Sequence, residues 1–169
     1  EIAVMVSELD NLKDIVIERA QLSLETDEQR SILDIQNKAI DSTTSGIVVS
    51  DAMQPDLPII FANKAFELQT GYSRQEVLGR NCRFLQNDDR DQKGVKELRE
   101  AIANQTSCSV VIRNYRKDGT LFYNNLKIDP VFNEQGEMTH FIGIQTDVTE
   151  MKRREAENTT KLEQEIARR

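Results

Sequence analysis

The stretch Gly79-Arg80-Asn81-Cys82-Arg83-Phe84-Leu85-Gln86 decides how this sequence is interpreted. It places a cysteine between an asparagine and an arginine, with a glutamine four residues further on. A lone cysteine is usually a small buried hydrophobe, and we interpret Cys108, the other cysteine, in that way. Cys82 has polar and charged neighbours instead, which indicates a thiol held against a ligand.

Outward from this stretch, residues 43–148 carry the signals of a small α+β domain. The predicted strands are 47–49, 58–61, 107–116, 120–129 and 140–147, and the predicted helices are 63–70, 73–79 and 91–104. Two strands therefore come first, short helices follow, and three strands close the domain. This order predicts a five-stranded antiparallel sheet with short helices on one face, a half-open cup that can hold a small molecule.

Charged, helix-prone segments flank the domain, and we expect both to be amphipathic helices. Residues 1–42 carry apolar residues at helical spacing, Ile2, Met5, Leu9, Leu12 and Val16, which indicates a helical cap or dimerisation segment. Thr26 and Gln29 resemble a capping box, which predicts a break near residues 23–27 and a second helix after it. Residues 149–169 have a thin apolar stripe, and we interpret them as a signalling helix. A homodimer through these helices is expected; the alternative is that the N-terminal helices pack back onto their own sheet.

Three side-chain amides lie on strand faces that should point into the core. Alternation along a strand puts residues two apart on one face. Asn114 thereby joins Val110 and Ile112, Asn124 joins Leu126 and Ile128, and Gln145 joins Phe141 and Gly143. A buried amide without a partner is costly, and amides both donate and accept. The three together suit the edge of a flat ring with alternating carbonyl and N–H groups, such as a flavin. Alternatively, they lie at strand ends and bind turns or water.

The string at 79–86 resembles the flavin-binding signature of LOV (light-oxygen-voltage) domains, the blue-light subset of the PAS superfamily that includes phototropins and bacterial photoreceptors. Asn114-Tyr115, Phe122-Tyr123-Asn124 and the run from Phe141 to Thr149 support the resemblance, which spans about residues 46 to 149. It implies a PAS fold, FMN as cofactor and a blue-light sensory function.

The resemblance also implies a role for each matching residue. Cys82 is expected to add reversibly to the flavin C4a carbon after blue-light excitation, and Gln145 to reorient and relay the change to the C-terminal helix. The other expected FMN contacts are Asn81 and Gln86 for the ribityl chain and ring edge, Arg83 and Arg99 for the phosphate, Asn114 and Asn124 for the pyrimidine edge, and Val48, Leu126, Ile128, Phe141 and Gly143 around the ring.

Composition excludes several other functions. The net charge of −7 without a long basic cluster argues against nucleic-acid binding, and no apolar run approaches the ~20 residues of a membrane helix. No metal-ligand spacing occurs, and two cysteines without a secretion signal indicate reduced thiols and a cytoplasmic location. Because the chain begins at Glu1, we expect a piece of a longer protein whose effector domain lies downstream.

Two other function classes compete with this interpretation. One is a PAS module without photochemistry that binds a metabolite or serves only to dimerise. The other is a flavin redox enzyme, which is disfavoured because the sequence has no acid/base pair, triad or phosphate loop. We therefore expect a sensory domain and not an enzyme.

Overall fold

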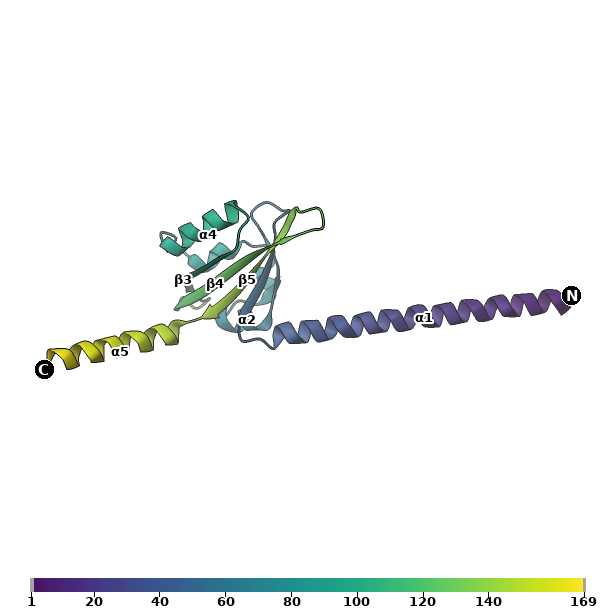
Figure 1. The fold of residues 1–169 in the computed structure, drawn as a ribbon, viewed down its shortest axis with the longest axis horizontal. Coiled ribbons are helices and arrows are strands. Elements are labelled where there is room, and N and C mark those ends of the chain that lie inside the picture. Colours follow the sequence, from purple (N-terminus) through teal and green to yellow (C-terminus); the bar gives the residue numbers. More distant parts are fainter. Residues whose placement is uncertain (1, 169) are drawn as a thin grey trace. The chain divides into compact units, whose positions relative to one another are not determined.

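A computed structural model describes residues 2–168, with side chains described for 15–19 and 21–168. The helices are α1 (Ile2–Asp41), α2 (Lys64–Thr70), α3 (Arg74–Val77), the 3-10 helix η1 (Cys82–Gln86), α4 (Lys93–Ala103) and α5 (Thr149–Ala167). The strands are β1 (Gly46–Asp51), β2 (Ile59–Ala62), β3 (Cys108–Tyr115), β4 (Leu121–Phe132) and β5 (Met138–Asp147) (Figure 1). The chain divides into two compact units, Glu1–Ile40 and Asp41–Arg169, which are described separately.

The second unit is built on one five-stranded sheet with the order β2-β1-β5-β4-β3. Every neighbouring pair is antiparallel, as predicted from the sequence. The last strand, β5, lies at the centre of the sheet, where it is hydrogen-bonded to β1 on one side and to β4 on the other.

Helices cover one face of the sheet and form the core with it. Apolar residues of α4, including Val95 and Leu98, pack against Ile112 of β3 and Leu126 of β4. A second cluster joins Phe66 of α2 and further residues of α3 and η1 to β1 and β2. The strand alternation thus places the predicted apolar sets on the helix-covered face, and the fold is the expected PAS-like α+β architecture.

Local signals in the sequence place the short helices. The side chain of Asn63 caps α2 by accepting the N–H of Phe66 at 3.0 Å, and Gly71 ends that helix in the left-handed region with φ 77°. The capping box of Ser73 and Glu76 is present at the start of α3. These elements form where they were predicted because each capping side chain satisfies a backbone N–H that the helix leaves free.

The predicted break in the N-terminal segment is wrong, because α1 continues from Ile2 to Asp41. Thr26 does not cap a second helix; its hydroxyl donates to the carbonyl of Leu22 one turn back, so it is satisfied inside the helix. The side chains of Ile2, Met5, Leu9 and Leu12 lie outside those that the structure describes. Within the described part of the chain, no helix combines the length and apolarity needed to cross a membrane.

Most of the exposed large apolar side chains in the described part of α1 lie in two stripes. Ile15, Leu22 and Leu33 are exposed and follow one another at steps of seven and eleven residues, which return to nearly the same side of a helix. Ile17, Leu24 and Ile35 are exposed as well and repeat these steps two residues later, on nearly the opposite side. Val16 and Ile32 are also exposed and lie between the stripes, so the helix has apolar residues on opposite sides.

Candidate functional site

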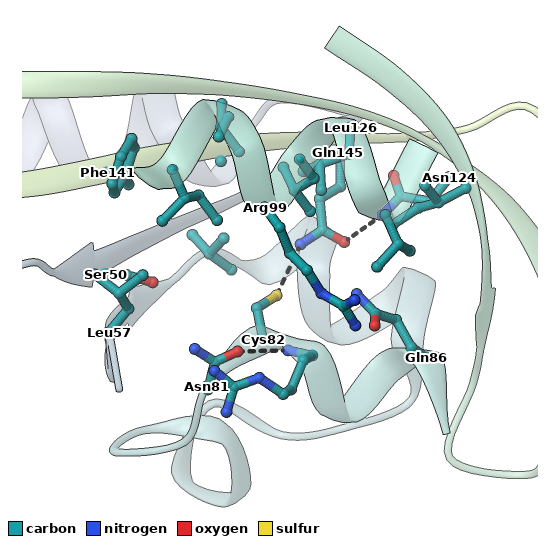
Figure 2. A pocket seen from close by; sticks show the side chains of 18 of the residues that line it. Ser50, Leu57, Asn81, Cys82, Gln86, Arg99, Asn124, Leu126, Phe141 and Gln145 are labelled. Atoms are coloured by element: carbon teal, nitrogen blue, oxygen red, sulfur yellow. Dashed lines mark hydrogen bonds between the residues drawn. The ribbon is translucent and has the colours of Figure 1, made fainter. Parts of the chain in front are cut away.

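One cavity of about 390 Å³ lies between the inner face of the sheet and the helices η1 and α4 (Figure 2). It is lined by every residue predicted to contact a flavin: Val48, Asn81, Cys82, Arg83, Gln86, Arg99, Asn114, Asn124, Leu126, Ile128, Phe141, Gly143 and Gln145. Residues that are far apart in the sequence are thus brought to one place.

Cys82 enters the cavity because it is the first residue of η1, a helix that the sequence analysis did not predict. The side chain of Asn81 caps η1 by accepting the N–H of Arg83 at 2.9 Å. Gln86, at the other end of η1, is buried and lines the same cavity. A 3-10 helix of five residues is too short to produce a periodic apolar pattern, which is why the spacing of apolar residues did not predict it.

The three predicted amides form a connected buried network. Asn124 Nδ2 donates to Asn114 Oδ1 at 2.9 Å and to Gln145 Oε1 at 3.1 Å. Gln145 Nε2 lies 3.6 Å from Cys82 Sγ, to which it donates (Figure 2). All three amide residues are at most 2% exposed, so the alternative that they lie at solvated strand ends does not hold.

One atom of this network lacks a partner. Among the residues that the structure describes, Asn124 Oδ1 and Gln69 Oε1 are the buried side-chain oxygens without a hydrogen bond. A buried acceptor left unpaired costs about 1–3 kcal/mol. Because Asn124 lines the cavity, a ligand with an N–H group could satisfy its oxygen.

Burial sets the chemistry of the Cys82 thiol. Desolvation raises the pKa of Cys82 to about 11, although the hydrogen bond from Gln145 acts in the opposite direction. The thiol is therefore protonated at neutral pH. A sulfur nucleophile normally needs a lowered pKa, so Cys82 does not carry the activation expected of a thiol enzyme.

A missing side chain keeps the floor of the cavity open. Gly143 on β5 pairs with Val48 on β1, and a Cβ at position 143 would come within 3.0 Å of Val48 Cγ2. The apolar side chains of Leu126, Ile128 and Phe141 surround this floor and are buried. Flat apolar surfaces with a polar edge suit a planar ring system.

Two arginines lie at the cavity, one paired and one unpaired. Arg83 Nη1 is 2.6 Å from Asp56 Oδ1. No ion pair of Arg99 occurs within the described residues, which leaves its guanidinium available to an anion. Guanidinium groups suit phosphate oxygens. The unpaired Asn124 oxygen, the open floor and these two cations together fit an FMN-sized ligand with a phosphate tail.

Part of the cavity lining was not predicted from the sequence. The additional residues are Ser50, Leu57, Val95, Leu98, Ile102, Ala103 and Ile112. The α4 members could have been found, since they share the buried side of a predicted helix. Leu57 had no such signal, because it enters the cavity from the loop between β1 and β2.

Comparisons with known proteins agree with this geometry. The model of the PAS domain family matches residues 44–150. A blue-light photoreceptor of Listeria monocytogenes is 46% identical over 116 residues, which cover 69% of this chain and 46% of that protein. A blue-light-activated histidine kinase of Rhizobium johnstonii is 49% identical over 118 residues, covering 70% of this chain and 34% of that protein. The solved structure of an RNA-binding Light-Oxygen-Voltage receptor aligns with a TM-score of 0.71 and 40% identity over 83% of this chain and 40% of that chain.

The chain belongs to the PAS domain family. Within that family it is a domain of the LOV type, as its similarity to blue-light photoreceptors and to a Light-Oxygen-Voltage receptor shows. It spans less than half the length of each of these relatives.

Proposed function

We propose that this chain is the sensor module of a blue-light receptor and binds FMN in the cavity between the sheet and η1. The observation that carries the proposal is the Cys82 thiol inside a cavity whose polar edge is built from three buried amides. The names of the similar photoreceptors support it.

The flavin, when bound, would supply the absorption of blue light and an electrophilic ring carbon, C4a. The role of Cys82 would be to give its sulfur to that carbon and its proton to the neighbouring ring nitrogen, N5. Cys82 would thus supply both the sulfur and the proton, so that no outside oxidant would be needed and the bond could reverse in the dark. A protonated resting thiol is compatible with this step, because light supplies the reactivity.

The other site residues would hold the cofactor. Asn114 and Asn124 would bind the pyrimidine edge, with the unpaired Asn124 oxygen accepting an N–H. Asn81 and Gln86 would bind the ribityl chain and ring edge, Arg83 and Arg99 the phosphate, and Val48, Leu126, Ile128, Phe141 and Gly143 would pack against the ring.

Gln145 would pass the change to α5. Its amide can exchange donor and acceptor by rotating, and it lies on β5 two residues before Asp147. Several hydrogen bonds hold the junction that follows. Arg116 donates to the Asp147 carboxylate at 2.5 Å. The N–H of Tyr123 on β4 donates to the Thr149 hydroxyl, and the N–H of Val148 donates to the Tyr123 carbonyl, at 2.9 Å each. A change in strand β5 therefore reaches the first turn of α5 without an intervening loop.

The signal would act on an effector outside this chain, with the domain itself sensory and not enzymatic. We further propose a homodimer assembled through α1 and α5, whose apolar residues are exposed in the described segments. Given the net charge of −7, we propose no direct binding of nucleic acid or membrane.

Absorption spectroscopy of the purified protein tests the proposal. We expect a yellow protein that bleaches under blue light and recovers in darkness. Cys82→Ala should keep the flavin and lose the bleaching, whereas the matched variant Cys108→Ala should behave as the wild type. A preparation that stays colourless after FMN is supplied would favour a PAS module without photochemistry, and bleaching that persists in Cys82→Ala would exclude Cys82 as the reacting group.

A further inference from the structure

A carboxylate stands beside one of the two arginines at the cavity. Asp56 Oδ1 lies 2.6 Å from Arg83 Nη1, and both side chains are about half exposed. Asp56 does not line the cavity itself, but its neighbour Leu57 does. The loop between β1 and β2 thus brings an acidic group to the end of the site where a cation is available.

The same loop is also hydrogen-bonded to Asn81, the residue before η1. Asn81 Nδ2 donates to the backbone carbonyl of Asp56 at 2.6 Å, while its Oδ1 caps η1. Asp56 thereby contacts two successive parts of the cavity rim, through its carboxylate and through its backbone.

The position of this loop is fixed by the backbone. The N–H of Asp51 donates to the carbonyl of Pro58 at 2.9 Å and closes the base of the loop. Ile59 then exchanges backbone bonds with Gly79 and Arg80, at 2.8 and 2.9 Å, just before Asn81. Asp56 and Leu57 both have positive φ, 69° and 50°, conformations that are unfavourable for leucine and persist only when the surroundings enforce them.

We propose that Asp56 sets the selectivity of the cavity between phosphorylated and unphosphorylated flavins, by competing with the ligand phosphate for Arg83. This inference rests on the proposed function and deepens it. A phosphate monoester carries close to two negative charges at neutral pH. If it binds Arg83, it meets the Asp56 carboxylate on the same guanidinium, and like charges repel. Arg99, which has no such competitor among the described residues, provides the uncontested part of the phosphate site.

The size of the effect follows from the exposure of the pair. Partly exposed ion pairs contribute modestly because water screens them, which corresponds to about a two- to fivefold change in affinity. Riboflavin has the same ring and ribityl chain without the phosphate, so its affinity should not depend on the Asp56 charge.

The test compares FMN and riboflavin in fluorescence titrations of the flavin-stripped full chain. Asp56→Asn removes the charge, and asparagine tolerates the left-handed backbone conformation. We expect the ratio of FMN to riboflavin affinity to rise by about two- to fivefold. In an Arg83→Gln background the same substitution should leave the ratio unchanged. Asp91→Asn, which breaks the exposed pair with Lys96 at 2.9 Å, is the matched control and should not alter it.

The outcomes separate the two proposals. If the wild type binds neither flavin, the proposed function fails. If it binds both and Asp56→Asn leaves the ratio unchanged or lowers it, the competition is refuted and the proposed function stands; a lower ratio would mean that Asp56 positions Arg83 for the phosphate. An equal rise in affinity for FMN and riboflavin would also refute the charge argument, since it would come from a change in the loop and not from the phosphate.

Discussion

Desolvation of the half-buried Cys82 thiol at the cavity determines its protonation. Its pKa of about 11 lies above the ordinary value of 9.0, so below pH 9 the thiolate fraction is about a hundredfold smaller than that of an unperturbed thiol. In a Cys108→Ser variant, we therefore expect alkylation of Cys82 by iodoacetamide at pH 8 to be much slower than in the denatured chain. Mass spectrometry of timed samples measures both rates, and equal rates would contradict the assignment of a buried thiol.

The same pKa shift predicts a change in stability with pH. The folded chain keeps the Cys82 proton at a pH where the unfolded chain loses it. Stability from this group is thus fully present below pH 9.0 and is lost as the pH rises toward about 11. Urea unfolding at pH 8 and pH 10 should show a smaller alkaline loss in Cys82→Ala than in the wild type; identical losses would argue against the shift.

Gln145 lies where the thiol, the amide network and the last strand meet. Leucine at this position can neither donate nor accept, but it has a similar size. We expect Gln145→Leu to keep reversible bleaching and to lose the light-dependent change in protease cleavage near Met151. Thr146→Ala, a neighbour whose side chain is exposed, is the control. A light-dependent cleavage that survives in Gln145→Leu would rule out this residue as the relay.

Among elements, β1 and α2 pack so closely at Gly46 that a larger residue there would force a neighbour to move. A Cβ at Gly46 would lie 2.9 Å from Gln69 Oε1 and 3.1 Å from Phe66 Cα. The first contact can move with a side chain, but the second is backbone. We expect Gly46→Ala to lower the free energy of unfolding by about 1–3 kcal/mol.

Denaturant unfolding measures this loss. Adding Gln69→Ala should restore only part of it, because the contact with the α2 backbone remains. An unchanged midpoint in Gly46→Ala would mean that the strand and the helix separate without cost.

The elements of the core could be predicted because each has a local cause. Asn63, Gly71 and the Ser73–Glu76 box fix helix ends, and alternation fixes the buried face of the strands. The 3-10 helix η1 could not be predicted, since five residues are too few to show a periodic pattern of apolar side chains. The break proposed in α1 failed because the hydroxyl of Thr26 is satisfied equally well within a helix and at its start.

Ion pairs between distant parts of the chain could not be predicted from the sequence. Arg113 forms a bidentate pair with Asp89 at 2.6 and 2.7 Å, which holds the pKa of Asp89 below its usual value. The Asp56–Arg83 pair likewise joins a loop to η1 across 27 positions of sequence. Such pairs depend on tertiary contacts that no local pattern encodes.

For the whole molecule, the two apolar stripes of α1 bear on assembly. Exposed leucines on both sides of a long helix favour contact with another chain. We expect the wild type to be a dimer by light scattering, and Leu22→Lys combined with Leu24→Lys, one change on each stripe, to lower its mass toward that of a monomer. Gln21→Lys with Glu25→Lys, at exposed polar positions, is the control. An unchanged mass in the leucine variant would place the dimer contact elsewhere.

The hydrogen bonds of Val148 and Thr149 with Tyr123 attach the start of α5 to strand β4, so that a tilt of the helix would turn about this point. A helix of 19 residues is about 28 Å long, so a tilt of about 10° at the pivot displaces its far end by about 5 Å. If Gln145 acts as the proposed relay, rotation of its amide would thus produce a movement of this size at the far end of α5. The hydrogen bonds at the junction would then determine how far the tip of α5 moves for a given change in β5.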